Sequence, residues 1–355
     1  MQIFHFPLTG SWVWAWFTRA LTHIGGRGLL ALIIFVGACT GLPPESQKET
    51  ELSKPLQPGN YLMALSYGER DRTYLLHIPP QGLSGRALPV VLNFHGGGGH
   101  ATQQQEYTEL DTVADREGFY TVYPNGTGRM SSHFLTWNAG NCCGYAKDHK
   151  IDDVGFSQAL LSHLSTVVPI DHTRIYATGL SNGAMMAYRL AAEASDLVAA
   201  IAPVAGSMMV STFAPSHAVP VMHVHSLDDP RAPYEGGEGP PFPLTNRRVT
   251  HPPVESQLHR WVERNQCQVP PQSGPVLYQT SSGFQRHQSA QKIQFTPCRT
   301  GADIVLWQLR GAGHVWPGGA PTPFQRFLGP PTNTIQINEE IWKFFSRYTR
   351  SPRNS

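Results

Sequence analysis

The stretch RIYATGLSNG, residues 174–183, indicates the fold of this chain. We expect a strand over 174–178, a tight turn at Ser181 and a helix over 182–193, so that GxSxG spans a strand-to-helix turn. Such a turn projects the serine hydroxyl into a cleft, flanking glycines relieve crowding, and the helix N-terminus favours developing negative charge. GxSxG alone is a weak signal in a chain with 34 glycines. The surrounding elements must therefore support it.

Segments on both sides of this stretch alternate between expected strands and expected helices. The strands are expected at 74–78, 89–94, 119–123, 219–224 and 303–309, and the helices at 153–168, 254–262 and 337–348. Alternation of this kind predicts βαβ units, a mostly parallel central sheet and helices on both faces. Together with GxSxG it predicts the α/β-hydrolase fold. Ligands of such sheets bind at the carboxyl ends of the strands.

Candidates for a base and an acid follow two later strands. In this fold the catalytic order is serine, then a carboxylate, then histidine. Asp228 and Asp229 follow the expected strand 219–224, and His314 lies in the loop GAGH after strand 303–309. The residues alone therefore predict Ser181 as nucleophile, His314 as base and one of the two aspartates as the orienting acid.

A glycine run after the strand 89–94 is the candidate oxyanion hole. His95 begins the segment HGGGG, residues 95–99, which is similar to the segment that supplies an oxyanion N–H in esterases. We expect one donor from Gly97 and the other from Asn182, the residue after the nucleophile. A phosphate-binding loop is the alternative, but the GK[ST] ending is missing.

Two histidines allow a competing metal interpretation. His223 and His225 would lie on one face of a strand and could share a metal ion, but the sequence supplies no third ligand. We expect them to be ordinary packed residues. The proposed chemistry requires neither a metal nor an organic cofactor.

Several side chains are candidates for lining a substrate pocket or supporting its loops. His95, Trp137 and Trp316 are the pocket candidates, and loop packing is the alternative for the two tryptophans. Asp152 and Asp153 start an expected helix. We therefore expect them to cap it and to support the loop around Trp137 rather than to form an acid pair.

The N-terminal region predicts export. No acidic residue precedes Glu45, and an apolar run over 29–36 ends in Val-Gly-Ala-Cys39. This resembles a lipoprotein signal that is lipidated at Cys39, with plain secretion or a membrane anchor as alternatives. The run is shorter than the roughly 20 residues a span needs. The predicted organisation is a signal over 1–39, a flexible tether over 40–58 and one domain over 59–350.

Charge and the remaining cysteines limit the possible partners. Net charge is +2 and no long basic run occurs, which disfavours nucleic acid as a partner. Cys142, Cys143, Cys267 and Cys298 are an even number in an exported chain and predict disulfides, whose connectivity the residues leave open. A zinc site lacks paired CxxC spacing.

The chain resembles the polyhydroxybutyrate depolymerase family of esterases, relatives of feruloyl and acetyl xylan esterases. The matching stretches are LNFHGGGG (92–99), VYPNGTG (122–128), TWNAGNCCG (136–144), DDVGF (152–156), TGLSNGAMMAYRLA (178–191), HSLDDPRAPYEGG (225–237) and GAGHVWPGG (311–319). The resemblance implies Asp229 as the triad acid and a Cys267–Cys298 disulfide. Two departures stand out: His-Ser-Leu-Asp replaces the family's His-Gly-Thr-x, and the segment 236–253 is long.

The resemblance implies an exported serine ester hydrolase acting on polyhydroxybutyrate-type or on feruloyl and acetyl polysaccharide esters. Its partner would be such an ester, and it would meet the membrane only through its N-terminal lipid. One alternative is a serine peptidase of the same fold, which would normally carry a gating domain. The other is an inactive surface lipoprotein that binds polyester or polysaccharide. An inactive scaffold would lack a triad residue, whereas all three candidates are present.

Overall fold

The computed structural model describes residues 56–242, 246–279 and 287–350. The predicted signal over 1–39, Cys39 and most of the tether lie outside the described residues. The first described strand begins at Gly59. None of the helices in the described ranges is both long and apolar enough to cross a membrane.

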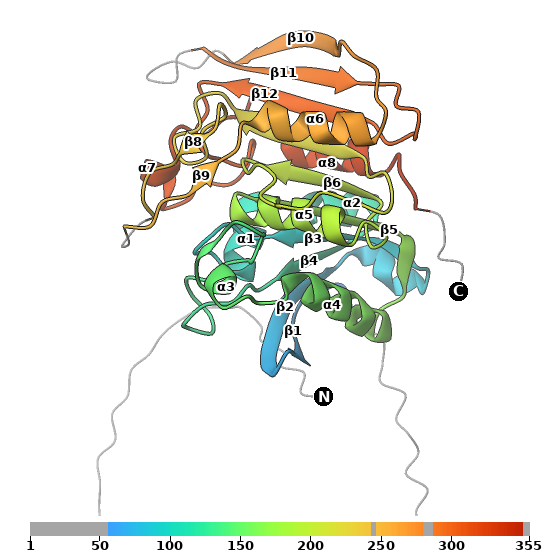
Figure 1. Cartoon of the computed structure of the whole chain (residues 1–355). Coiled ribbons are helices and arrows are strands. Elements are labelled where there is room, and N and C mark those ends of the chain that lie inside the picture. The colour runs from blue at the N-terminus through green and yellow to red at the C-terminus, as the bar shows by residue number, and fades with distance from the viewer. Residues whose placement is uncertain (1–55, 243–245, 280–286, 351–355) are drawn as a thin grey trace, which may run out of the picture. The chain divides into compact units, whose positions relative to one another are not determined.

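A ten-stranded sheet forms the centre of the domain (Figure 1). Its strands, in spatial order, are β1 (Gly59–Tyr67), β2 (Arg70–Ile78), β4 (Tyr120–Pro124), β3 (Leu88–Phe94), β5 (Ile170–Leu180), β6 (Ala200–Val204), β7 (Val221–Ser226), β12 (Ile304–Arg310), β11 (Gln288–Phe295) and β10 (Gln272–Gln279). The six strands from β4 to β12 are parallel, and two antiparallel strands flank them on each side. A small ladder, β8 (Gly237–Glu238) with β9 (Thr250–His251), stands apart. The predicted mostly parallel sheet is confirmed.

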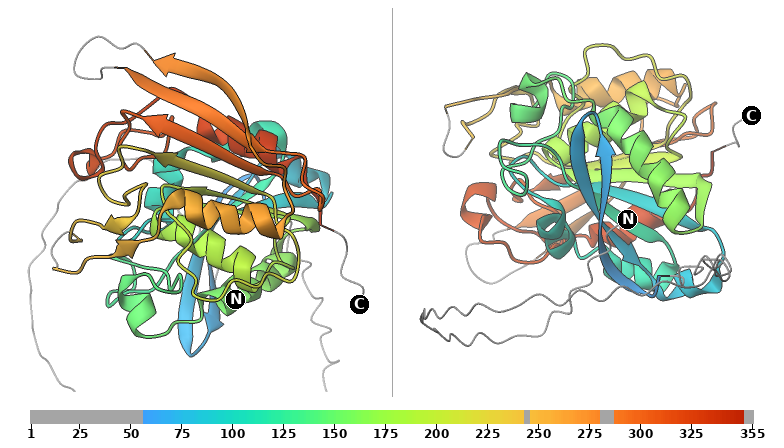
Figure 2. Two further views of the ribbon diagram at one scale, coloured as in Figure 1. Left: turned by 45° about the horizontal axis from the view of Figure 1, so that its top comes forward. Right: turned by 90° about the horizontal axis from the view of Figure 1, so that it is seen from below.

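Helices cover both faces of the sheet, as predicted. One face carries α4 (Asp153–Val167), α5 (Asn182–Glu193) and α6 (Val254–Arg264), and the other carries α2 (Asp111–Glu117) and α8 (Ile337–Phe345). Short helices complete the domain: η1 (Pro80–Ser84), α1 (Ala101–Thr108), α3 (Gly144–Asp148) and α7 (Gln325–Leu328). The left panel of Figure 2 shows α5 and α6 side by side over one face. Each face has its own apolar core.

The apolar periodicity of the helices decides which face they bury. In α6, Leu258, Trp261 and Val262 are buried, and in α8 Ile341 and Phe345 are buried. These positions repeat at helical spacing, so each helix sets one stripe against the sheet. Complete burial of a large apolar side chain contributes about 1.5–3 kcal/mol, which makes these stripes the main attachment of the helices.

The loops that follow the parallel strands gather at one edge of the sheet. In Figure 1, α1, α3, α7 and the β8–β9 ladder lie at the edge where the arrowheads of the parallel strands end. This is the position at which open α/β sheets bind ligands. All residues predicted to carry chemistry lie on these loops or at these strand ends.

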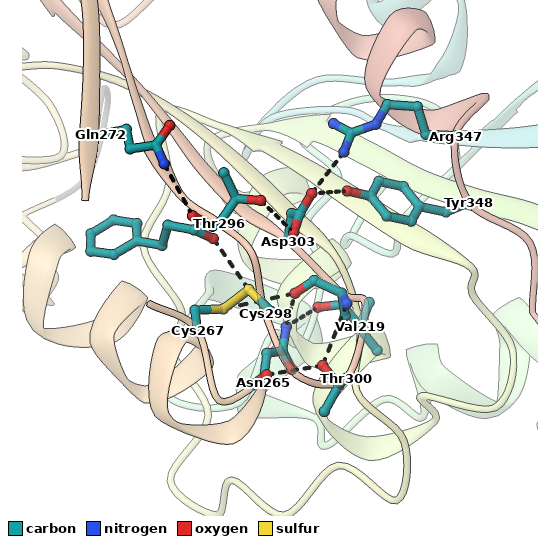
Figure 3. The surroundings of a disulfide bond; sticks show 12 residues. Val219, Asn265, Cys267, Gln272, Thr296, Cys298, Thr300, Asp303, Arg347 and Tyr348 are labelled. Carbon is teal, nitrogen blue, oxygen red and sulfur yellow. Dashed lines mark hydrogen bonds and ion pairs between the residues drawn. A yellow bond between two sulfur atoms is a disulfide. The ribbon is translucent and has the colours of Figure 1, made fainter. Parts of the chain in front are cut away.

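Four cysteines form two disulfides. Cys267, just after α6, is joined to Cys298 in the loop between β11 and β12, as the resemblance implied (Figure 3). Cys142 is joined to its neighbour Cys143, which answers the connectivity that the residues left open. Beside the Cys267–Cys298 bond, the Asn265 side chain donates to two backbone carbonyl oxygens. The disulfide therefore closes a loop that hydrogen bonds also hold.

Candidate active site

Ser181 occupies the turn between β5 and α5. Its backbone has φ 58° and ψ −118°, and its N–H donates to Val204 O at 2.9 Å. A positive φ is uncommon for a residue with a side chain and is typical of a strained strand-to-helix turn. The predicted helix bounds of 182–193 are those of α5, whereas β5 runs from Ile170 to Leu180 and is longer at both ends than the predicted strand over 174–178.

The glycines around Ser181 are required by close backbone approach. A Cβ placed on Gly179 or on Gly183 would overlap the carbonyl oxygen of Phe94, the last residue of β3. A Cβ on Gly206 would overlap the carbonyl oxygen of Ser181 itself. The GxSxG spacing therefore lets β3 and the loop after β6 close around the turn.

His314 and Asp229 are brought together. His314 Nδ1–H donates to Asp229 Oδ2 at 2.7 Å, and both side chains are buried. The other carboxylate oxygen, Oδ1, accepts the backbone N–H groups of Arg231 at 2.7 Å and Ala232 at 2.9 Å. Asp228 instead accepts the N–H of Gly311 on its Oδ2. The geometry thus distinguishes the two aspartates, and Asp229 contacts the histidine.

The charge of Asp229 is stabilised by its neighbours. Burial by itself would raise the pKa of this carboxyl, but nearby His314 and His225, and hydrogen bonds from both, outweigh burial and hold it well below its ordinary value. Asp229 is consequently a carboxylate throughout the physiological range. A carboxylate bonded to Nδ1 leaves Nε2 of a neutral imidazole free to accept a proton.

The loop that carries His314 is fixed by backbone contacts. The N–H groups of Gly313 and His314 donate to Pro330 O at 2.8 Å and Leu328 O at 2.6 Å. Within the described residues, the Ser181 hydroxyl makes no hydrogen bond with His314, so the last link of the triad stays a prediction. Such contacts often tighten only when substrate is bound.

The predicted oxyanion donors lie next to each other. A Cβ on Gly97 would stand 3.6 Å from Asn182 Cβ, and one on Gly96 would stand 3.7 Å from Ser181 Cβ. Asn182 is the first residue of α5, where the backbone N–H has no partner within the helix. Among the described residues no hydrogen bond engages the backbone N–H of Gly97.

Trp137 holds the Asn182 side chain in place. The Trp137 N–H donates to Asn182 Oδ1 at 2.7 Å, and Asn182 Nδ2 donates back to Trp137 O at 3.1 Å. The Trp137 indole N–H donates to His95 O at 3.0 Å. One tryptophan therefore connects the helix start to the glycine-rich loop.

The His95 side chain joins the glycine-rich loop over 95–99 to the loop that follows β4. Its Nδ1–H donates to Gly96 O at 2.7 Å, and its Nε2 accepts the Gly126 N–H at 3.0 Å. Complete burial lowers the pKa of His95 from 6.5 to about 4, so the ring is neutral at pH 7. A neutral ring with one donor and one acceptor matches these two partners.

The three pocket candidates are all buried. His95 and Trp137 make the contacts above, and Trp316 donates its indole N–H to Asn338 Oδ1 at 2.9 Å. These contacts hold loops together, as the loop-packing alternative for the two tryptophans expects. Contact of these three residues with substrate stays a prediction.

The aspartates at the start of α4 behave as expected. Asp152 caps the helix through the N–H of Gly155 at 2.9 Å, and Asp153 accepts the N–H of Asn138 at 2.8 Å, which supports the loop after Trp137. The sequence reasoning missed Arg72, which pairs with buried Asp153 at 2.8 Å. Burial of a carboxylate without such a partner is costly.

His223 and His225 face each other, and no group of three or more side chains in the described ranges is arranged to hold a metal ion. His223 Nε2 lies 3.0 Å from His225 Nδ1. His225 Nε2 lies 3.3 Å from Asp229 Oδ2. His225 was expected to be an ordinary packed residue, although it precedes Asp229 by only four residues.

A groove of about 430 Å³ opens beside the candidate oxyanion loop. Its lining includes Gly98, His100, Tyr107, His133, Phe134 and Phe324. Phe134 is 59% exposed and Phe324 is 50% exposed, so aromatic rings form part of an open rim. The sequence reasoning did not single out these residues, because a lone exposed phenylalanine carries no motif.

Known proteins resemble this chain in sequence and in fold. The family model described as esterase PHB depolymerase matches residues 72–237. NocK of Nocardia uniformis subsp. tsuyamanensis, assigned as an esterase, is 30% identical over 268 residues, which cover 70% of this chain and 72% of NocK. The bifunctional acetylxylan esterase/xylanase XynS20E of Neocallimastix patriciarum is 27% identical over 74% of this chain, which spans 31% of that larger protein.

A solved structure supports the fold. The acetyl xylan esterase from Aspergillus awamori superimposes with a TM-score of 0.52 at 13% identity, covering 80% of this chain and 98% of that one. An identity this low is evidence for fold alone, and the fold is that of the α/β-hydrolases. The sequence matches show that this chain is a carboxylic ester hydrolase and belongs to the PHB depolymerase family of esterases.

Proposed function

We propose that this esterase hydrolyses its ester through an acyl-enzyme formed on Ser181, with His314 as base and Asp229 as orienting acid. The observation that carries the proposal is the 2.7 Å hydrogen bond from His314 to Asp229. It occurs at the same edge of the sheet as the strained turn of Ser181. A nucleophile, a base and an orienting carboxylate at one edge are what acyl transfer requires.

In the first half of the reaction, Ser181 Oγ bonds to the ester carbonyl carbon while its proton passes to His314 Nε2. The carbonyl π electrons move to the oxygen, where the N–H groups of Gly97 and Asn182 stabilise the negative charge. The tetrahedral intermediate then expels the alcohol oxygen. That oxygen takes the proton from His314, so the alcohol leaves neutral and the acyl group stays on Ser181.

In the second half, water replaces the alcohol. His314 Nε2 takes one proton from water as its oxygen bonds to the acyl carbon. The intermediate expels Ser181 Oγ, which recovers its proton from His314, and the carboxylic acid is released. Asp229 keeps the imidazole in the tautomer that leaves Nε2 available in both halves.

The substrate we propose is an ester of a polymer or oligomer, either polyhydroxybutyrate-type or a feruloyl or acetyl polysaccharide ester. The groove beside Gly98 supports a substrate longer than a simple acetate, because it extends from the oxyanion loop between exposed aromatic rings. Aromatic rings bind apolar or ring-shaped groups through large contact area.

We further propose that the esterase is exported and lipid-anchored through Cys39. The two disulfides support export, because disulfides persist in oxidising compartments. A Cys39→Ser variant is expected to move from the membrane fraction to the soluble fraction and to lose palmitate labelling. Unchanged labelling would contradict lipidation at this position.

The test of the mechanism is hydrolysis of an ester panel by the purified protein and by Ser181→Ala. The panel contains p-nitrophenyl esters of increasing length, methyl ferulate, acetylated xylan and hydroxybutyrate oligomers. Turnover is expected from the protein and none from the variant, whose melting temperature should be unchanged. A fully active Ser181→Ala would overturn the assignment. The preferred member of the panel identifies the substrate class.

A further inference from the structure

A buried row of polar side chains leads to the candidate triad acid. It begins at Tyr188 on α5, whose hydroxyl lies 3.0 Å from His223 Nδ1, and continues from His223 Nε2 to His225 Nδ1 at 3.0 Å. All three residues are at most 2% exposed. Buried polar groups of this kind need hydrogen-bond partners, and here the partners are the neighbours in the row and, for His225, the carbonyl oxygen of Ala232.

The last residue of the row, His225, carries its hydrogen on Nε2, the ring nitrogen that faces Asp229. His225 Nε2 lies 2.8 Å from Ala232 O and 3.3 Å from Asp229 Oδ2, and both of these oxygens can only accept. A ring nitrogen between two acceptors must carry the hydrogen. This conclusion holds whichever way the earlier links of the row are directed.

When both histidine rings are neutral, the donor and the acceptor of the two earlier hydrogen bonds in the row are also determined. With its proton on Nε2, a neutral His225 accepts on Nδ1, so His223 Nε2–H is the donor. His223 Nδ1 is then an acceptor for the Tyr188 hydroxyl. Burial and the neighbouring His225 hold the pKa of His223 well below its ordinary value, consistent with a neutral ring. Every dipole in the row points its positive end toward Asp229.

We propose that His225 is a positioning residue for the triad acid, supported from behind by His223 and Tyr188. His225 Nε2–H lies 3.3 Å from Asp229 Oδ2, the same oxygen that accepts from His314 Nδ1. It also donates to Ala232 O and so holds the turn over 229–232 from the strand that precedes it. This inference rests on the proposed triad.

Two donors on one oxygen make the two histidines interdependent. Without His225, the negative charge on Asp229 Oδ2 would be faced by the N–H of His314 alone. The carboxylate would then attract the protonated form of His314 more strongly. The acid limb of kcat/KM should then move to higher pH. The other charged or titratable groups that act on this pair are His251 of β9 and Arg231 of the turn, and both remain in place.

The experiment compares His225→Leu with His225→Gln on a p-nitrophenyl ester. Leucine removes the donor, whereas the glutamine amide keeps an N–H near the position of Nε2. For His225→Leu we expect kcat to fall about ten- to a hundredfold with KM nearly unchanged, the range for hydrogen bonds to charged groups. We also expect a raised acid limb and a displaced downfield His314 Nδ1–H proton resonance. His225→Gln should restore most of kcat and the pH profile.

A matched pair of tyrosine variants controls for loss of a buried hydroxyl. Tyr188→Phe removes the start of the row, while Tyr74→Phe removes a buried hydroxyl that lies 2.9 Å from His163 Nδ1, outside the row. We expect Tyr188→Phe to lower kcat about two- to fivefold and Tyr74→Phe to leave it unchanged. If His225→Leu does not fold, His225→Gln and Tyr188→Phe carry the test.

The outcomes separate this inference from the proposed function. A folded His225→Leu with the kcat and pH profile of the unchanged protein overturns the role of His225, even when Ser181→Ala is inactive. An active Ser181→Ala overturns the triad itself. Equal effects of the two tyrosine variants on kcat would also contradict the role of the row.

Discussion

The catalytic edge and the groove beside it are built in different ways. At the edge, Ser181, Asp229 and His314 are held by backbone hydrogen bonds and by glycines that allow close approach. In the groove, Phe134 and Phe324 are about half exposed. We infer that the chemistry depends on backbone positions that tolerate little change, while substrate choice depends on side chains that can vary at small cost to stability.

Substitution of the triad acid should remove most of the activity. Asp229→Asn should lower kcat about 10⁴-fold, because the amide holds the imidazole in the wrong tautomer, as found for the analogous serine protease substitution. KM should change little. The measurement is kcat and KM on a p-nitrophenyl ester.

Asp228→Asn is the matched control for this prediction. Asp228 binds a backbone N–H and not the histidine, so its variant should keep most of kcat. If Asp228→Asn is the inactive variant of the two, the acid has been assigned to the wrong neighbour.

Replacing a glycine beside Ser181 should destabilise the fold. Gly183→Ala sets a methyl group against the backbone oxygens of Phe94 and His95, neither of which can move alone. We expect the free energy of unfolding to fall by about 2–3 kcal/mol, measured by urea denaturation. Gly97→Ala, whose methyl would meet only ordinary contacts, should be close to neutral in stability. Equal losses would contradict the close-approach argument.

Acid should lower the stability of the fold through two buried histidines. His95 and His251 have their pKa lowered from 6.5 to about 4, chiefly by burial. Between these values the unfolded chain binds protons that the folded chain does not, so stability falls as pH falls from 6.5 toward 4. Each should contribute a loss of about 2 kcal/mol between pH 7 and pH 5. Urea midpoints across this range, with His95→Gln showing a shallower slope, check the sign.

The smallest effect is expected in the groove. Phe134→Ala and Phe324→Ala should each raise KM for long or aromatic esters about three- to fivefold and leave kcat/KM for p-nitrophenyl acetate unchanged. Phe327 is similarly exposed but does not line the groove, so Phe327→Ala is the control. An equal rise for acetate would mean that the groove acts through stability and not through recognition.

Much of this organisation was predictable because its signals are local. Apolar periodicity predicted α6 and α8, and the GxSxG spacing around Ser181 predicted the turn and the start of α5. The resemblance, and not periodicity, chose Asp229 over Asp228. The flanking strands β10 and β11 escaped prediction because they are polar or exposed, and β10 contains Gly274 and Pro275, residues that weaken a strand signal.

What escaped prediction at the site depends on contacts between distant segments. The pairing of Arg72 with Asp153 joins positions 81 residues apart, and Tyr188 reaches His223 across 35 residues. No spacing rule relates such positions. His225 was within reach, since it lies four residues before Asp229, but a histidine in a strand is most often a packed residue.

The Cys267–Cys298 bond also determines how the chain would respond to a protease. The whole β10–β11 hairpin lies between the two cysteines. A cut anywhere in that hairpin would leave the part carrying His314 covalently attached to the part carrying Ser181. The cleaved protein would run as one band on a non-reducing gel and as two after reduction, and it could remain active while nicked.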